Sequence, residues 1–260
     1  MQIGLLGKAN VGKSTFFSAA TETVVPTGNF PFTTIEPNVG VAHVKVDCAC
    51  KNLENRCGNN SCVNGTRFIA VKLIDVAGLV PGANEGKGLG NQFLTDAMQA
   101  DALIHVVDAS GSTDIQGQPV PIGTHDPLED IKFVEEEFDL WFKQILDREW
   151  HKLTKEIEQK RTRISEGLAR RFTGLGIKES DIDKILISMS LKSKKPTEWL
   201  DSEIIEFLKS LRRLSKPTII AANKADLCDD LAIIQKMSED FITIPSSAET
   251  EFLLKKATKA

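Results

Sequence analysis

The sequence lacks the features that define several large classes of protein. It has no run of about 18 apolar residues, the length at which a helix begins to span a bilayer, so we expect no membrane partner. Its N-terminus has neither a basic segment nor a small-residue cleavage site, which predicts a cytoplasmic protein. It has no excess of positive charge, with 32 basic and 36 acidic residues, and this argues against a protein that coats nucleic acid over its whole surface. What remains is the composition of an ordinary globular protein, with 41% hydrophobic and 26% charged residues and no internal repeat.

Cysteine is scarce outside one short segment. Four of the five cysteines are Cys48, Cys50, Cys57 and Cys62, and the fifth is Cys228. This is not the even spread of a disulfide-rich secreted protein. Four thiolates can close a structural zinc site, but the C-x-C spacing is tighter than the usual zinc knuckle. Zinc, disulfides and free thiols therefore all stay open for the cluster, and Cys228 is expected to be a lone thiol.

Apolar runs alternate with helical stretches in the first and last parts of the chain. We predict strands at 3–6, 39–46, 68–74, 102–107, 218–222 and 241–244. Some of these runs are almost continuously apolar, which is typical of a parallel sheet buried on both faces. The sequence therefore predicts an α/β fold with a mostly parallel, doubly wound sheet.

The middle of the chain has a different pattern. Asp126, Pro127 and Glu129 occupy the N-cap, first and third positions of a strong helix start. The sequence that follows is charged and helical in period. Its predicted apolar stripe consists of Phe142, Ile145, Leu146, Leu153, Ile157, Ile164 and Leu168. The predicted division is a sheet domain at 1–126 and 216–260, a helical insertion at 127–215, and a cysteine-rich loop at 48–62.

A glycine-rich phosphate-binding signature lies between the first predicted strand and the first helix. Residues 7–14 read G-K-A-N-V-G-K-S and match G-x-x-x-x-G-K-[ST] in the strand–loop–helix context that this P-loop signature requires. The glycines let backbone N–H groups approach the phosphates of a nucleotide, assisted by the helix N-terminus. Lys13 should reach the β- and γ-phosphates, and Ser14 should ligate Mg²⁺. The predicted phosphate-contacting set is Gly7, Asn10, Val11, Gly12, Lys13, Ser14 and Thr15.

Asp75 and Gly78 form a D-x-x-G motif at the end of the strand predicted at 68–74. In a parallel sheet this is the edge at which ligands bind. The Asp75 carboxylate can hold Mg²⁺ through water there, and the Gly78 N–H can sense the γ-phosphate. The motif is weak by itself, but after a phosphate loop it predicts a second half of the same site.

The sequence N-K-A-D at 223–226 predicts recognition of guanine. The Asp226 carboxylate can accept hydrogen bonds from N1–H and the exocyclic amine of guanine, whereas adenine has no donor at N1. Lys224 can lie along the nucleotide, and Asn223 can tie this loop to the base and to the phosphate loop. Ser247 and Ala248, after the last predicted strand, would complete the base pocket.

The order of these motifs resembles a translation-factor-type GTPase. Two longer segments, N-F-P-F-T-T-I-E-P-N-V-G at 29–40 and G-L-V-P-G-A-N-E-G-K-G-L-G at 78–90, are similar to the Obg family and its YchF-like branch. The resemblance implies a P-loop GTPase switch whose mobile segments, about 22–38 and 76–92, order around the γ-phosphate and Mg²⁺. It also implies an association with ribosomes or RNA, and a monomer is expected. A C-terminal TGS domain, which the family carries, is not expected in this chain.

The resemblance also assigns individual residues. Thr34, rather than its neighbour Thr33, is implied to ligate Mg²⁺ in the triphosphate state. Leu79 stands where Ras-like enzymes carry a water-orienting glutamine, so hydrolysis should be slow or be completed by another group. Asn10 matches an asparagine that binds K⁺ in related GTPases, although it can equally brace the loop. The predicted catalytic set is Lys13, Thr34, Gly78 and Asn10.

Two other functions stay open. YchF proteins depart from N-K-x-D and prefer ATP, but this sequence keeps Asp226, which favours GTP. A binding module with negligible turnover is also consistent with Leu79. The basic stretch at 152–171 is either an RNA-facing helix or a solvated helix face, and the three tryptophans are expected to anchor helix packing.

Overall fold

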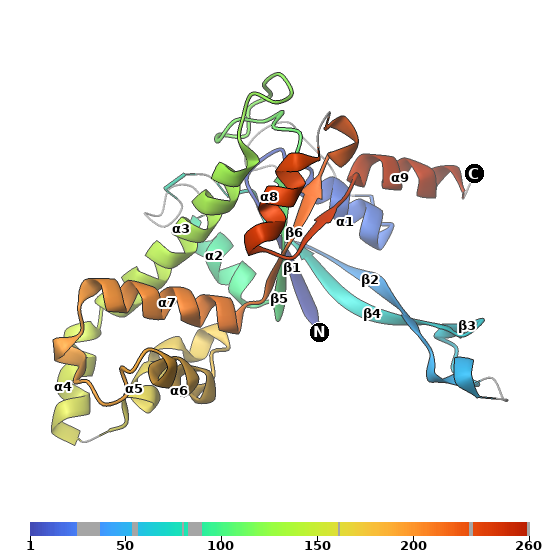
Figure 1. Cartoon of the computed structure of the whole chain (residues 1–260). Coiled ribbons are helices and arrows are strands. Elements are labelled where there is room, and N and C mark those ends of the chain that lie inside the picture. Colours follow the sequence, from blue (N-terminus) through green and yellow to red (C-terminus); the bar gives the residue numbers. More distant parts are fainter. Residues whose placement is uncertain are drawn as a thin grey trace.

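A seven-stranded sheet forms the centre of the protein, with strand order β2-β4-β1-β5-β6-β7 and β3 paired to β4 (Figure 1). The structure is a computed structural model that describes residues 1–24, 37–53, 57–79, 81–82, 90–160, 162–228 and 231–258. The strands are β1 (Gln2–Leu6), β2 (Asn38–Asp47), β3 (Cys62–Val63), β4 (Thr66–Asp75), β5 (Ala102–Asp108), β6 (Thr218–Asn223) and β7 (Thr243–Pro245). From β4 across to β7 all pairings are parallel, while β2 and β3 run antiparallel to β4. The predicted mostly parallel sheet is confirmed.

Helices cover both faces of this sheet, as expected for a doubly wound fold. They are α1 (Lys13–Thr21), α2 (Gly90–Met98), α3 (Pro127–Asp147), α4 (Trp150–Lys160), α5 (Ile164–Phe172), α6 (Glu179–Ser188), α7 (Asp201–Ser215), α8 (Ala232–Asp240) and α9 (Ala248–Ala257). On one face, α1 buries Phe17 against Leu5 and Leu73. On the other, α2 and α3 pack over β1 and β5, and α8 over β6. Within the described ranges, no helix is long and apolar enough to cross a membrane.

The strand predicted near the C-terminus begins two residues too early and ends one residue too early. A strand was predicted at 241–244, but β7 is Thr243–Pro245, and α8 has no counterpart among the predicted elements. The reason is that Phe241 directly follows α8 and packs against the buried cluster around Ile220 and Met237. Its apolar character therefore reflects the packing of a helix end rather than a strand.

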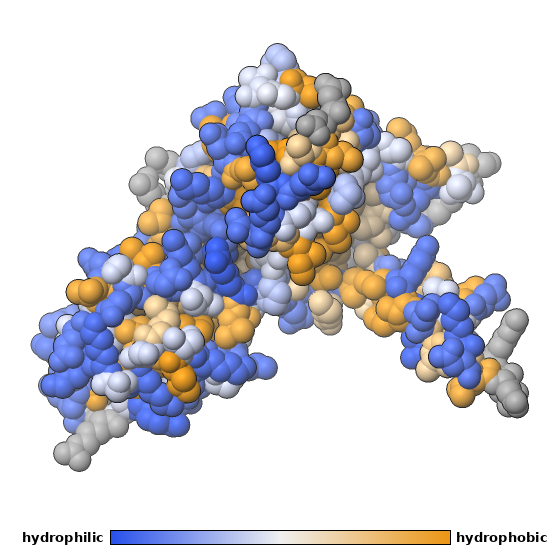
Figure 2. Space-filling model, in the orientation of Figure 1, coloured by the Kyte–Doolittle hydropathy of each residue, from blue (hydrophilic) through white to orange (hydrophobic). Residues whose placement is uncertain are grey.

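The hairpin formed by β2 and β4 extends well beyond the rest of the sheet (Figure 1). Its register pairs Asn38 with Asp75 at the sheet end and Asp47 with Thr66 at the far end. At roughly 3.4 Å per residue, those two pairs lie about 30 Å apart along the strands. In the space-filling view the hairpin stands apart from the other lobes of the molecule (Figure 2). The cysteine-rich segment therefore lies at the tip of a long arm, remote from the sheet edge that carries Asp75.

The helices α3 to α7 fill residues 127–215 and extend away from the sheet (Figure 1). The predicted start is confirmed, since Pro127 opens α3 and the Asp126 side chain accepts a hydrogen bond of 3.0 Å from Leu128 N. The predicted apolar stripe is also confirmed, with all of its members buried or packed against the core. One buried cluster joins these side chains to Leu6 and Ile74 of the sheet, so the helical segment shares its core with the sheet domain.

Tryptophans and ion pairs hold the helical segment together. Trp150 and Trp199 lie with ring centroids 5.6 Å apart, and Trp141 packs edge-on against a phenylalanine at 5.7 Å, which confirms the tryptophans as packing anchors. In the basic stretch, Arg170 and Arg171 pair with glutamates of the same helical segment. These internal pairings favour the solvated-face interpretation of the basic stretch, and hydrophilic side chains cover much of this lobe (Figure 2).

Candidate functional site

The phosphate loop lies between β1 and α1, and two of its glycines are required by close contacts. Gly7 has φ +144°, and a Cβ there would lie 2.4 Å from Val106 O. Gly12 has φ +94°, and a Cβ there would lie 2.4 Å from the Asn223 side-chain nitrogen. Any side chain at either position would displace a neighbouring element. Only glycine therefore lets the backbone approach β5 and the N-K-A-D loop at 223–226, called the base loop below.

Lys13, in the first turn of α1, is buried, and its Nζ donates a 2.6 Å hydrogen bond to Lys8 O. Burial lowers the pKa of Lys13 to about 8, and the negative charge of Asp75 opposes this shift. A buried ammonium with so little compensation is stabilised by a further negative charge. The arrangement is therefore suited to an anionic phosphate beside Lys13.

Ser14 and Asp75 come together where α1 meets the end of β4. Ser14 Oγ donates a 2.7 Å hydrogen bond to Asp75 Oδ2. Within the described ranges, Asp75 Oδ1 is buried and accepts no hydrogen bond. Burial raises the pKa of Asp75, opposed first by the Ser14 hydroxyl and then by the charge of Lys13. A hydroxyl and a carboxylate with an unused buried oxygen are hard donors that fit Mg²⁺.

Gly78 and Leu79 lie directly against the phosphate loop. Leu79 N donates a 3.0 Å hydrogen bond to Gly7 O. A Cβ on Gly78 would lie 3.0 Å from Ala9 Cα and 3.2 Å from Lys13 Nζ, so this backbone borders the place where the γ-phosphate is expected. The Leu79 side chain is only 2% exposed and packs in the core, so it does not face the phosphates.

The predicted switch residues Thr33 and Thr34 lie outside the described residues, as does much of the segment predicted at 76–92. The Mg²⁺ role of Thr34 therefore stays a prediction.

Asn223, at the end of β6, connects three loops. It is 2% exposed, its Nδ2 donates a 2.8 Å hydrogen bond to Val11 O, and its Oδ1 accepts one of 2.9 Å from Ala248 N. The phosphate loop, the N-K-A-D loop and the loop after β7 are thereby held in one arrangement. The geometry predicted for Asn223, from the base loop to the phosphate loop, is present, and the link to Ala248 extends it.

In the base loop, Asp226 is exposed, whereas the end of Lys224 is bonded to a buried carboxylate. Asp226 lies in a short 3₁₀ turn and is exposed, so its carboxylate is accessible to a base. Lys224 has φ +57°, and its Nζ contacts Asp108 Oδ2 at 2.7 Å and Ser112 Oγ at 3.0 Å. The charged end of Lys224 is thus fixed by the turn that follows β5. Ser247 is the N-cap residue of α9, two residues after the end of β7.

The loop after β5 lies across the phosphate loop. Asn10 has φ +62°, and its Nδ2 donates a 2.8 Å hydrogen bond to Gly117 O. A Cβ on Gly117 would lie 2.7 Å from Ala9 Cβ, so the two loops are in close contact. Asn10 therefore braces this pair of loops, and its K⁺ role stays a prediction.

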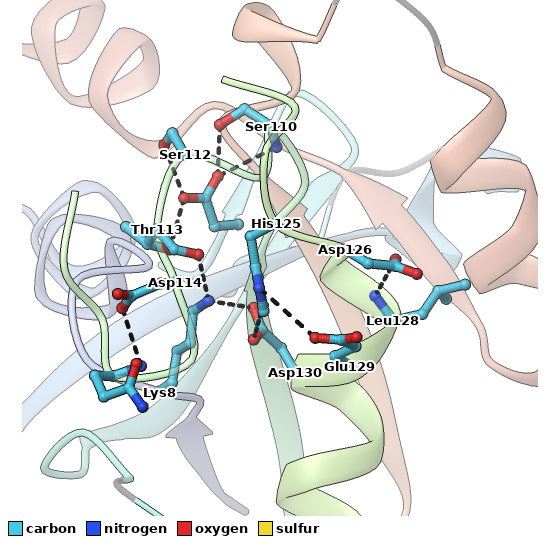
Figure 3. A network of polar contacts seen from close by, with 12 residues as sticks. Lys8, Ser110, Ser112, Thr113, Asp114, His125, Asp126, Leu128, Glu129 and Asp130 are labelled. Atoms are coloured by element: carbon cyan, nitrogen blue, oxygen red, sulfur yellow. Dashed lines mark hydrogen bonds and ion pairs between the residues drawn. The ribbon is translucent and has the colours of Figure 1, made fainter. Parts of the chain in front are cut away.

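A buried polar network under this loop was not predicted from the sequence (Figure 3). Lys8 is fully buried, and its Nζ lies 2.8 Å from Asp130 Oδ2 and donates a 2.7 Å hydrogen bond to Thr113 O. His125 Nε2 lies 2.7 Å from the other Asp130 oxygen. Burial lowers the pKa of Lys8, and Asp130 opposes that shift. The first turn of α3 is thus bonded directly to the phosphate loop.

Asp108, at the end of β5, organises the turn above that network (Figure 3). Its two oxygens accept hydrogen bonds from Ser110 Oγ at 2.6 Å and from Ser112 Oγ at 2.8 Å. Burial alone would raise the pKa of Asp108, but the hydrogen bonds of Lys224 and Ser110 outweigh it and hold that pKa below its usual range. A single ionised carboxylate therefore orders the turn and anchors the base loop.

Replacing Asp130 by asparagine is expected to lower the free energy of unfolding by about 3 kcal/mol, because it leaves the buried Lys8 cation without its counter-ion. Urea unfolding followed by circular dichroism measures the change. The matched control is Glu129→Gln. The Glu129 side chain is 67% exposed, and its contact with His125 is long, at 3.8 Å. Equal losses for the two variants would contradict the importance of the buried pair.

Three comparisons place the chain among known proteins. Residues 2–138 match a family profile described as 50S ribosome-binding GTPase. The chain is 48% identical to a GTP-binding protein of Methanocaldococcus jannaschii, over 99% of this chain and 65% of that protein. It is 33% identical to the ribosome-binding ATPase YchF of Bacillus subtilis, over 95% of this chain and 59% of that protein.

The crystal structure of a GTP-binding protein from Pyrococcus horikoshii OT3 superimposes on this chain with a TM-score of 0.82 at 38% identity, covering 100% of this chain and 68% of that one. The predicted fold class is therefore confirmed. The chain spans less than two thirds of the length of both sequence relatives named above, at 65% and 59%.

Proposed function

The chain belongs to the family of 50S ribosome-binding GTPases and has YchF-like relatives, and from this premise we propose that it is a molecular switch that binds and hydrolyses GTP. The observation that carries the proposal is the double hydrogen bond of Asn223 to Val11 and Ala248. These two bonds join the phosphate loop, the N-K-A-D loop and the loop after β7, where the base would bind. Two loops held in this way would suit a nucleotide, with one loop contacting the phosphates and the other contacting the base.

The proposed phosphate chemistry uses Lys13, Ser14, Asp75 and Gly78. Lys13 would contact the β- and γ-phosphates, and Ser14 and Asp75 would hold Mg²⁺, directly and through water. When bound, Mg²⁺ would neutralise charge on the phosphate oxygens. The Gly78 N–H would report the presence of the γ-phosphate to the segment that follows it.

The proposed hydrolysis is slow without help, because Leu79 is buried in the core and cannot orient the attacking water. Two groups would complete it. Thr34 would join the Mg²⁺ shell in the triphosphate state, and Asn10 would place K⁺ beside the phosphates, where it stabilises charge that develops in the transition state. A partner could supply the missing group instead.

The proposed base is guanine, because Asp226 is exposed in the N-K-A-D loop and its carboxylate would accept hydrogen bonds from N1–H and the exocyclic amine. Ser247 and Ala248 would line the other side of the base. The Bacillus subtilis relative is named as an ATPase, so adenine is the specific alternative. Competition between ATP and GTP for the nucleotide-free protein decides between them.

The proposed partner is the ribosome. The support is the description of the family and the name of the Bacillus subtilis relative, both of which mention ribosome binding. The exposed side of the helices at 127–215 is the surface that we propose for that partner, on a monomeric, cytoplasmic protein. The second candidate function, a binding module with negligible turnover, rests on the burial of Leu79.

Single-turnover GTP hydrolysis tests the proposal, measured in K⁺ and in Na⁺ buffer, each with and without ribosomes. We expect K⁺ to accelerate the wild-type protein by about 10²-fold, the size of effect that one electrostatic group gives. The ratio of rates in K⁺ and Na⁺ should fall to about 1 in Asn10→Ala and stay unchanged in Asn52→Ala, an exposed asparagine at the hairpin tip. Near-zero rates in all four conditions, with GTP bound, would favour the binding module.

A further inference from the structure

The tip of the β2–β4 hairpin brings four cysteine side chains together. Cys48 follows β2, Cys50 lies in the short 3₁₀ turn Ala49–Asn52, and Cys62 begins β3. The Sγ atoms of these three and of Cys57 all lie within 4.8 Å of one another. The Cys48–Cys57 and Cys50–Cys62 sulfur pairs are each 3.6 Å apart. This packing of four sulfurs around one point requires an explanation.

The distances match a tetrahedral metal site. With Zn–S bonds of about 2.3 Å, sulfurs at the corners of a tetrahedron are about 3.8 Å apart. The two shortest pairs are close to that value, and every other pair is within reach of it after small side-chain movements. We propose that Cys48, Cys50, Cys57 and Cys62 bind one structural zinc ion that closes the hairpin tip.

Backbone hydrogen bonds around the sulfurs support this site. The N–H groups of Cys50, Asn59 and Gly65 donate to the sulfurs of Cys48, Cys57 and Cys62 respectively. Thiolates bound to a metal keep negative charge and are oriented by such donors. Three of the four sulfurs therefore already have the outer hydrogen bonds that a thiolate site needs.

Arg67 supplies positive charge to the cluster. It pairs with Cys62 across β3 and β4, and its guanidinium lies beside the Cys48 and Cys57 sulfurs. Its Nε–H is buried and donates to no protein acceptor within the described ranges. One zinc ion with four thiolates carries a net charge of about −2, so a neighbouring guanidinium lowers the cost of that charge.

Among the described residues of the tip, two cysteines are the most deeply buried apolar side chains. Cys48 and Cys50 are 4% and 7% exposed, whereas the nearby apolar residues Leu53 and Val63 are 66% and 55% exposed. The cysteines themselves are thus the core of the tip. Segments too small to bury a hydrophobic core are commonly closed by a metal or by disulfides.

The cluster geometry favours a metal over disulfides. Two disulfides require only that the sulfurs approach in pairs, to about 2.05 Å within each pair. Here all four sulfurs are mutual neighbours, and none of the four is bonded to another. One metal ion bound by all four sulfurs requires that they all be neighbours, whereas two separate disulfides do not.

Zinc content and cobalt substitution test the proposal on the whole chain. After a wash with chelating resin, the wild-type protein is expected to retain about one zinc ion per chain, as measured by elemental mass spectrometry. Cys57→Ser and Cys62→Ser should lose it, whereas Cys228→Ser should keep it, since Cys228 lies outside the cluster. Cobalt(II) added to the metal-stripped wild type should show the visible bands of a tetrahedral ion and a thiolate charge-transfer band.

A second measurement uses the distance between the tip and the nucleotide site. Strong chelation should expose the hairpin tip to protease while the affinity for fluorescent GDP is unchanged, because about 30 Å of hairpin separates the two. Three results would overturn the proposal: a metal-free wild-type protein with reactive thiols in the cluster, two disulfides in its mass spectrum, or iron in place of zinc. The wild-type measurements do not depend on whether the serine variants fold.

Discussion

Replacing Asp226 by asparagine is expected to change the preferred base from guanine to xanthine. The wild-type carboxylate can accept two hydrogen bonds from guanine, each worth about 1.5–3 kcal/mol because the acceptor is charged. An asparagine amide places a donor against one of the guanine donors, so GTP affinity should fall by about 10²- to 10³-fold. Xanthine has a carbonyl at that position, which accepts from the amide, so XTP should bind the variant more tightly than GTP.

Competition titrations with fluorescent GDP measure this change. The matched control is Asp240→Asn, which makes the same substitution at an exposed position at the end of α8. The wild type should also bind GTP far more tightly than ATP, since adenine leaves the carboxylate unpaired. Equal affinities for ATP and GTP, unchanged in Asp226→Asn, would show that Asp226 does not read the base.

Replacing Lys13 by alanine is expected to separate nucleotide binding from folding. The variant should bind GTP about 10²- to 10³-fold more weakly and hydrolyse it at least about 10²-fold more slowly, because one preorganised positive charge on the phosphates is lost. GDP affinity should fall less, because GDP has no γ-phosphate. The free energy of unfolding should be unchanged or higher, since burial already disfavours the Lys13 ammonium in the free protein.

Isothermal titration with GTP and GDP, together with urea unfolding, measures both parts of this expectation. Lys45→Ala is the control, because Lys45 is an exposed lysine on the hairpin arm. A Lys13→Ala protein that binds GTP normally would remove Lys13 from the phosphate site. One that is strongly destabilised would show instead that the lysine has a structural function.

The parts of the fold that could be predicted are those in which local sequence and burial agree. β5 and β6 are nearly continuous apolar runs because both faces of the sheet are covered, and α3 begins where Asp126 caps it. The phosphate loop could be predicted because close contacts restrict Gly7 and Gly12 to glycine. In each case, the local surroundings of the residue restrict which residue type can occupy the position.

The parts that could not be predicted depend on contacts between distant segments. Lys8 occupies a variable position of the phosphate-loop signature, and Asp130 is one of two acidic residues in the first turn of α3. Helical period places Asp130 on a face of α3 but does not identify the lysine that it meets. Phe241 is a second example, because an apolar residue after a helix packs in the same way as one in a strand.

The buried Lys8–Asp130 pair also has a mechanical consequence. It attaches the first turn of α3 to the phosphate loop, and α3 is 21 residues long, which corresponds to a rod of about 31 Å. A tilt of about 5° at the attached end displaces the opposite end of such a rod by about 3 Å. The next helix, α4, begins just beyond that opposite end, whereas α7 runs back along α3 to the sheet and is bonded to α3 through Arg212. A small displacement of Lys8 would therefore be amplified along α3, from the proposed nucleotide site to the start of α4.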